Sequence, residues 1–322
     1  MERRQVAYGQ PREVKLLERL NMIIGIDVGN TNMTGALASD DGKHLATLRR
    51  KSDRAGGAKA GVKLISEIIA ELQKQAAGEG GSVRRIGVGF GGPVDFERGV
   101  ALLSHQNPGW ENTPLRDQLQ QRFGIPIAID NDANAGTLGE WRFGAGRGVN
   151  DLLYVNIGTG IGGGVIANGA LVRGAQNLAG EIGHIIVRRD GPVCTCGKHG
   201  CLEGCASGSA IGRRASEALG RKVDGKEVDA LALQGDATAR RVLDDVIEDL
   251  AHGLGIAIGL VNPALIIIGG GLSQAPEPLY LAPLRRAVPR FCLAEAAAHI
   301  RIEPAQLRYD AGVMGAVALA MS

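Results

Sequence analysis

Three cysteines and one histidine lie within eighteen residues and have the composition of a metal site. The thiols belong to the segment Cys-x-Cys-Gly-x-x-Gly-Cys, as Cys194, Cys196 and Cys201, and His184 precedes them. The two glycines allow tight bends, so three sulfur atoms can converge on one point. Three thiolates and one imidazole suit tetrahedral Zn²⁺ and leave no open position for a reacting water. The pattern therefore predicts a structural zinc site.

Two other interpretations of these thiols stay open. They can be ordinary reduced cysteines, or two of them can form a disulfide. Nothing marks the chain as secreted, and cytosolic thiols stay reduced, which makes the disulfide the weaker rival. Cys205 and Cys292 are expected to lie outside the metal site.

The same segment carries side chains that can bind hydroxyl groups. Glu181 and Glu203 flank it, and each carboxylate can accept hydrogen bonds from two hydroxyls. A ligand histidine uses one ring nitrogen for the metal, so the other edge of His184 can face a substrate.

A first candidate phosphate loop follows the apolar run at 22–26. It reads Asp-x-Gly-x-Thr and contains Asp27, Gly29, Asn30 and Thr31. Gly29 lets backbone N–H groups approach a phosphate, Thr31 donates a hydroxyl, and Asp27 can hold Mg²⁺ through water. Many hairpins carry Asp-Gly turns, so this motif is weak when taken alone.

A second glycine-rich turn, with Gly158, Thr159 and Gly160, lies between expected strands at 151–157 and 165–167. A dinucleotide-binding loop would be followed by a helix, so the strand argues against NAD. The unit repeats the strand, turn and strand of 24–38. This repetition predicts two similar α/β halves, each with one phosphate loop.

Acids and amides lie where an expected strand at 125–129 gives way to a helix. Asn131 or Asp132 can simply cap that helix, or Asp132 can take a proton from a hydroxyl that Asn131 orients. Position alone does not decide between these roles. Similarly, Gly91 and Gly92 end a strand and permit either a close ligand or a tight turn.

Composition limits the class of protein. The chain has 322 residues, a mass of 33.6 kDa and a net charge of +2, so no nucleic-acid partner is expected. No apolar run is long enough to span a bilayer, and the N-terminus has no signal-peptide core. A cytoplasmic protein without a membrane partner is expected.

Strands and helices alternate along the chain, which predicts mixed sheets with helices on both faces. Residues 1–21 are expected to be a loose tail, with an arm packed on a partner subunit as the alternative. Helices are expected at 61–75, 113–123, up to 142, 207–219, 238–261, 281–298 and 311–321.

Gly-Glu-Ile-Gly-His at 180–184, followed by Cys-x-Cys-Gly-x-x-Gly-Cys-x-Glu, resembles the ROK family of bacterial sugar kinases and repressors. The resemblance extends from about residue 22 to the C-terminus and is closest to the zinc-containing, ATP-dependent glucokinases. It implies an actin-like or ribonuclease-H-like α/β fold with two lobes around a cleft. The expected lobes are 22–129 plus 306–322, and 130–305, which carries the zinc site.

The resemblance implies phosphoryl transfer from MgATP to the 6-hydroxyl of a hexose, with Asp132 as catalytic base. It implies that the sugar contacts are Gly92, Asn107, Asn131, Asp132, Glu181, His184 and Glu203. The implied nucleotide contacts are Asp27, Gly29, Asn30, Thr31, Gly158, Thr159, Gly160, Gly269, Gly270 and Gly271, of which the last three match an adenosine loop.

The alternatives are an N-acetylhexosamine kinase and a sugar-responsive repressor. A repressor needs an N-terminal DNA-binding domain, for which residues 1–21 are too few. Some relatives use polyphosphate as donor, and the identity of the hexose stays open. A homodimer or homotetramer is expected.

Overall fold

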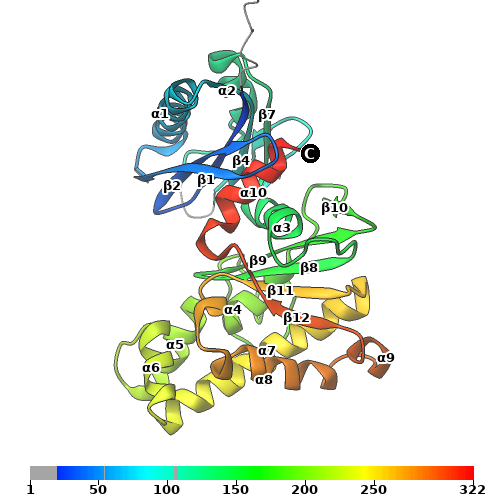
Figure 1. The fold of residues 1–322 in the computed structure, drawn as a ribbon. Coiled ribbons are helices and arrows are strands. Elements are labelled where there is room, and N and C mark those ends of the chain that lie inside the picture. Colours follow the sequence, from blue (N-terminus) through cyan, green and yellow to red (C-terminus); the bar gives the residue numbers. More distant parts are fainter. Residues whose placement is uncertain (1–19, 54, 105–107) are drawn as a thin grey trace, which may run out of the picture.

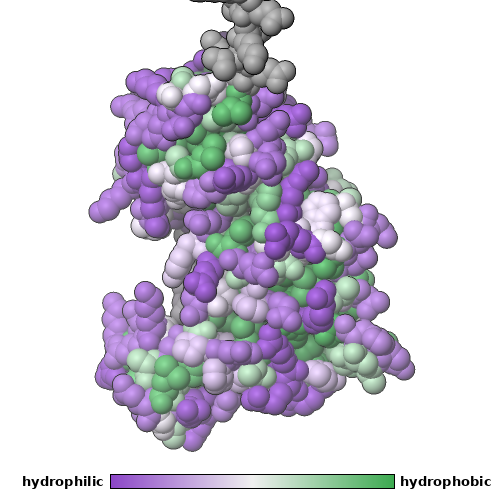
Figure 2. Space-filling model, in the orientation of Figure 1, coloured by the Kyte–Doolittle hydropathy of each residue, from purple (hydrophilic) through white to green (hydrophobic). Residues whose placement is uncertain are grey.

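A computed structural model describes residues 20–53, 55–104 and 108–322 of the chain. Within these ranges the chain forms two five-stranded mixed sheets and a short two-stranded sheet, with helices between and outside them (Figure 1). The predicted α/β class is therefore confirmed. The molecule is hollowed on one side, between the part that contains α1 and the part that contains α5 and α6 (Figure 2).

The first sheet has the strand order β3-β2-β1-β4-β7. The strands β1 (Leu20–Val28), β2 (Asn32–Ser39) and β3 (His44–Lys51) form an antiparallel meander. Parallel to β1 run β4 (Gly81–Phe90) and then β7 (Ile127–Asn131). Helices cover both faces of the central strands, which explains why β1 is a continuous apolar run rather than an alternating one.

The second sheet repeats this order as β10-β9-β8-β11-β12. Its meander consists of β8 (Leu152–Ile157), β9 (Ile161–Ala167) and β10 (Ala170–Val172), and β11 (Leu265–Gly269) and β12 (Arg301–Pro304) add in parallel. The prediction of two similar halves is thus confirmed. Each half places one tight turn, between its first two strands, at the same end of its sheet.

The elements stack in five layers (Figure 1). On the outer face of the first sheet lie α1 (Gly57–Gly78) and α2 (Leu115–Phe123), which close its core. Between the two sheets lie α3 (Asp132–Phe143) and α10 (Ala311–Ala320). The last described helix therefore returns to the first sheet, as expected.

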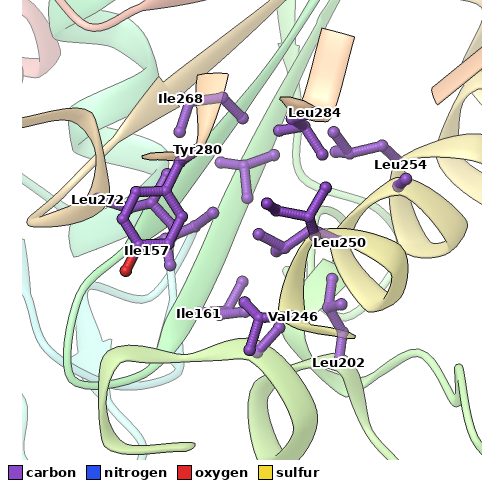
Figure 3. Packing of buried hydrophobic residues seen from close by; sticks show 14 of the residues in the cluster. Ile157, Ile161, Leu202, Val246, Leu250, Leu254, Ile268, Leu272, Tyr280 and Leu284 are labelled. Carbon is purple, nitrogen blue, oxygen red and sulfur yellow. The ribbon is translucent and has the colours of Figure 1, made fainter. Parts of the chain in front are cut away.

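The outer face of the second sheet is covered by the remaining helices. In Figure 3, Leu250 and Leu254 of α7 point toward Ile268 of β11 and Leu284 of α8, within one apolar core. In the described ranges no helix is long and apolar enough to cross a membrane. The helices are α4 (Leu202–Ala206), α5 (Gly208–Leu219), α6 (Gly225–Leu233), α7 (Ala237–Val261), α8 (Leu281–Ala287) and α9 (Ala294–Ala297), and the small sheet pairs β5 (Val94–Asp95) with β6 (Val100–Ala101).

Three local predictions were wrong. The helix expected at 281–298 is interrupted by a 3₁₀ turn at Val288–Arg290, because Pro289 has no N–H to continue the helical ladder. Helix α2 begins at Leu115 rather than at residue 113. Strand β1 begins at Leu20, inside the expected tail. The lobe boundaries 22–129 plus 306–322 and 130–305 stay a prediction.

Glycines let the backbone of helix α10 approach its neighbours closely. A Cβ atom on Gly87 of β4 would lie 1.8 Å from the carbonyl oxygen of Ala316, and one on Gly315 would lie 2.0 Å from that of Ala135 in α3. Since real Cβ atoms do not approach this closely, glycine sets the spacing between α10, α3 and the sheet.

Gly315→Ala is therefore expected to lower the free energy of unfolding by about 1–3 kcal/mol, through overpacking, despite the better helix propensity of alanine. Gly259→Ala is the matched control, because that helical glycine in α7 is exposed and has no neighbour within 4 Å. The control should be stabilised by up to about 1 kcal/mol. Urea unfolding followed by circular dichroism measures both. Equal stability of Gly315→Ala and wild type would show that α10 shifts without cost.

Candidate active site

A cavity of about 440 Å³ lies where the two tight turns face each other, and both sheets contribute to its wall. Asp27, Gly29 and the 269–271 loop are not part of its lining, and Asn107 lies outside the described residues. The expected site residues that do line it are Asn30, Thr31, Gly92, Asn131, Asp132, Gly158, Thr159, Gly160, Glu181, His184 and Glu203.

The cap of α3 is Asn131. Its side-chain oxygen accepts from the backbone N–H groups of Ala133 (2.9 Å) and Asn134 (3.2 Å), and its amide nitrogen donates to the Gly92 carbonyl oxygen (3.1 Å). Capping by Asn131 leaves the carboxylate of Asp132, in the first helical turn, open to the cavity. Both amide atoms of Asn131 have backbone partners. The contact of Asn131 with sugar stays a prediction.

Burial raises the pKa of Asp132 to about 6, and the nearby Glu181 carboxylate adds to the shift. Many protein atoms lie around the Asp132 carboxylate and partly remove its hydration, although the side chain is still exposed in the cavity. Burial also raises the pKa of Asp27 to about 7, with repulsion from Asp132 as the second cause, while Arg49 opposes the shift. A cation bound nearby would stabilise the charged forms of both carboxylates and lower their pKa values, which fits the expected Mg²⁺. A carboxylate of near-neutral pKa suits a general base.

Asp130 is buried and positions the start of α3. Its carboxylate accepts from Arg173 Nε (2.8 Å), from Asn134 Nδ2 (2.9 Å) and from the N–H of Asn131 (2.8 Å). Arg173 follows β10 of the second sheet, and its guanidinium lies 3.7 Å from the centre of the Phe96 ring. The ion pair thus joins the two sheets beside Asp132. No pattern in the sequence indicates this ion pair, because its partners are 43 residues apart.

Asn134 was also missed. It is buried, it lines the cavity, and its side-chain oxygen has no hydrogen-bond partner within the described part of the chain. A buried acceptor without a donor is costly, so this oxygen is suited to a ligand or water donor. The available signal was its place one helical turn after Asp130. Asn156 and Asn177 line the cavity as well, and the sequence did not single them out.

The predicted metal ligands converge. One ligand atom from each of His184, Cys194, Cys196 and Cys201 lies within 4.8 Å of the others. The Sγ atom of Cys194 is 3.7 Å from His184 Nδ1, and the Sγ atoms of Cys196 and Cys201 are 3.6 Å apart. Tetrahedral Zn²⁺ with three sulfurs and one nitrogen needs separations of about 3.6–3.8 Å, so the donor set fits zinc. Cys205 and Cys292 lie outside this group, as expected.

His184 turns its two edges in different directions. Its Nδ1 atom faces the sulfur atoms, while its Nε2 atom lies 3.9 Å from a carboxylate oxygen of Glu181, at the cavity. This is the geometry expected for a residue that serves a metal on one edge and a ligand on the other.

Glu203 connects the cysteine segment to the second turn. One carboxylate oxygen accepts from the N–H of Ile161 (3.0 Å), at the start of β9, and the other accepts from the hydroxyl of Thr195 (2.8 Å). A Cβ atom on Gly160 would lie 2.4 Å from the Glu203 carboxylate, so a side chain there would displace that carboxylate. Glu203 therefore links the cysteine segment to the second glycine-rich turn, which the sequence did not predict.

The 269–271 glycines lie beside that turn rather than in the cavity. Gly270 has φ of +74°, and a Cβ atom on it would lie 2.4 Å from the Ile157 carbonyl oxygen, at the end of β8. Only glycine satisfies both conditions. The adenosine contact of this loop stays a prediction.

Comparisons with known proteins agree with this geometry. The "Glucokinase" of Thermotoga maritima is 36% identical over 311 residues, covering 92% of this chain and 96% of that protein. The crystal structure of a ROK family glucokinase from Streptomyces griseus in complex with glucose and AMPPNP superposes with a TM-score of 0.78 and 35% identity, covering 93% and 99% of the two chains. The ROK Hexokinase of Thermus thermophilus gives a TM-score of 0.83 with 32% identity, covering 93% and 97%. These neighbours confirm the predicted two-lobed, actin-like ATPase fold.

Relatives with other names also match. The "Xylose repressor" of Caldicellulosiruptor bescii is 31% identical over 330 residues, covering 97% of this chain and 81% of that protein. The "N-acetylmannosamine kinase" of Shigella flexneri is 30% identical over 298 residues, covering 92% and 98%. The ROK family model matches residues 23–322, so the chain belongs to the ROK family.

Proposed function

We propose that the chain is an ATP-dependent hexose kinase that phosphorylates the 6-hydroxyl of glucose. The observation that carries this proposal is the position of Asp132, whose carboxylate is open to a cavity faced by both phosphate turns. Relatives at 31–36% identity over most of their length are glucokinases, which supports a transferase acting on glucose.

In the proposed reaction the sugar 6-oxygen attacks the γ-phosphorus of ATP, the bond from that phosphorus to the β-phosphate oxygen breaks, and ADP leaves. Asp132 accepts the hydroxyl proton late, because the hydroxyl becomes acidic only as the new bond forms. Thr31, Thr159 and backbone N–H groups of both turns hold the phosphates. Mg²⁺, when bound, neutralises phosphate charge, and Asp27 is the residue that would hold it through water.

Sugar recognition is assigned to the part of the cavity that is lined by residues flanking the cysteine segment. Glu181, His184 and Glu203 bind ring hydroxyls, with Gly92, Asn131 and Asn107 as further expected contacts. A structural Zn²⁺ on the three cysteines and His184 would hold this wall in place. Binding the sugar there directs its 6-hydroxyl toward Asp132.

The proposal is tested by measuring ADP release with glucose, mannose, fructose, N-acetylglucosamine and N-acetylmannosamine. We expect kcat/KM for glucose to exceed that for either N-acetylhexosamine by about tenfold or more, since relatives at 31–36% identity are glucokinases. Replacing ATP with polyphosphate tests the donor, for which ATP is expected. Turnover restricted to an N-acetylhexosamine would favour the N-acetylmannosamine kinase alternative.

The activity is expected to fall as the pH drops below about 6. Burial raises the pKa of Asp132 to about 6, so below that value the carboxylate is protonated and accepts no proton from the sugar. Well below it, kcat/KM should fall about tenfold per pH unit. The measurement is kcat/KM for glucose between about pH 5 and pH 8 at MgATP concentrations well below its KM, because bound Mg²⁺ would lower the pKa of Asp132. A flat profile down to the lowest pH would contradict the role of Asp132.

The repressor alternative predicts no turnover with any sugar and a sugar-dependent change in DNA binding. A gel-shift assay at physiological salt separates it from the kinase. Assembly as a homodimer or homotetramer is part of the proposal, and analytical ultracentrifugation tests it.

A further inference from the structure

A second cavity, of about 640 Å³, lies toward the far end of α3 from Asp132. It shares no lining residue with the active-site cavity. Its wall is formed by the last turns of α3, the loop that follows, the edge strand β10 and the end of α10. Its size falls in the range of small-molecule sites, which is about 300–1,000 Å³.

The charge of this cavity comes from arginine. Arg142 ends α3, Arg147 lies in the following loop, and Arg173 follows β10, so three separate segments each contribute one guanidinium. No aspartate or glutamate is among its lining residues. Within the described ranges Arg142 and Arg147 make no ion pair, whereas Arg173 is paired with Asp130. Two of the three guanidinium groups therefore have no carboxylate partner in the described part of the chain.

Arg173 is held in place from outside the cavity. Its Nε donates to Asp130 (2.8 Å), and its guanidinium lies against the ring of Phe96, which leaves its side chain only 23% exposed. In the described part of the chain, the two terminal nitrogens of Arg173 make no hydrogen bond. An arginine held in this way has already lost most of its conformational entropy before it meets a ligand.

The remaining wall is apolar. Leu138, Leu171 and the indole of Trp141 line it, and the indole nitrogen is occupied by the Val149 carbonyl oxygen at 2.8 Å. Guanidinium groups bind phosphate oxygens in planar pairs of hydrogen bonds, and an apolar wall accommodates a carbon skeleton. We propose that this cavity binds a small phosphate-bearing anion, at a site separate from the one that binds ATP and sugar.

Intrinsic fluorescence provides a direct test. The chain has two tryptophans, of which Trp110 is buried in the first lobe beside Phe90 and Trp141 lines the cavity. Inorganic phosphate and glucose 6-phosphate are titrated separately into Trp110→Phe protein at constant ionic strength, with KCl as the blank. Equilibrium dialysis of labelled phosphate with the otherwise unmodified chain repeats the measurement without that substitution. The expected result is a saturable change for both phosphates. Glucose 6-phosphate is the product of the proposed reaction and can also bind in the active-site cavity, so only the binding that requires Arg142 and Arg147 reports on the second cavity.

The double variant Arg142→Gln/Arg147→Gln is expected to weaken this binding by about tenfold or more. The matched control is Arg240→Gln/Arg241→Gln, because those two arginines are exposed on α7, lose the same charge and line neither cavity. The control should bind as wild type does. The proposal is overturned if no saturable change occurs, or if both double variants bind phosphate equally well.

Discussion

Asp132→Asn is expected to lower kcat for hexose phosphorylation by about 10²–10⁴, the usual contribution of a positioned general base. The substitution keeps the size and hydrogen-bonding reach of the side chain and removes its basicity. Asn131 still caps α3, so the fold around the site should persist. The sugar KM or dissociation constant should change little, because the loss falls on the transition state. Steady-state kinetics and calorimetric sugar binding measure the two effects separately.

Asp244→Asn is the matched control for this variant. Asp244 is exposed on α7, far along the chain from the cavity, and does not line it. It should turn over as wild type does. If Asp132→Asn retains activity within a few-fold of wild type, the carboxylate serves only as a favourable charge at the start of α3, and the proposed mechanism is wrong.

Cys196→Ser is expected to release zinc and raise the sugar KM by about tenfold or more, because the loop between His184 and Glu203 loses its anchor. Glu203 also accepts from the N–H of Ile161, so the second phosphate turn should loosen and the KM for ATP should rise as well. The protein should contain one zinc per chain as purified. Elemental analysis, steady-state kinetics and thermal unfolding measure these effects.

Cys292→Ser is the control, since that cysteine lies outside the ligand group. It should keep its zinc and its activity. A catalytic metal would behave differently, with kcat following the identity of a substituted ion while sugar affinity stays steady. Absence of zinc from active wild-type protein would refute the structural role.

The sequence predicted the elements whose patterns are local. The buried strands before Gly29 and Gly158 were visible as apolar runs that end in glycine and threonine, and the repetition of that unit predicted the matched sheets. The metal ligands were visible because three of them lie within eight residues. Such patterns can be read from the sequence because the residues that form them are close neighbours along the chain.

Contacts between distant segments were not predicted. Nothing in the sequence relates Arg173 to Asp130 or Glu203 to Ile161, since each pair is more than 40 residues apart. The first pair meets only when both sheets are formed, and the second only when the segment after the cysteines folds back onto the start of β9. Asn131 and Asp132 were indistinguishable as caps, because either side chain can accept from the same N–H groups. The helix expected at 281–298 failed for another reason, since the prediction did not take account of Pro289, which cannot continue the helical ladder.

The position of α10 has a consequence for synthesis of the protein. This helix is the last in chain order that the structure describes, yet it covers the sheet that begins with β1. While the chain is being made, that face of the first sheet stays uncovered until residues 311–320 have left the ribosome. Its apolar side chains are then a target for chaperones or for association with other nascent chains. We expect ribosome-bound chains that stop before residue 311 to be cleaved by protease within the first sheet, and chains extended past residue 320 by a linker to resist.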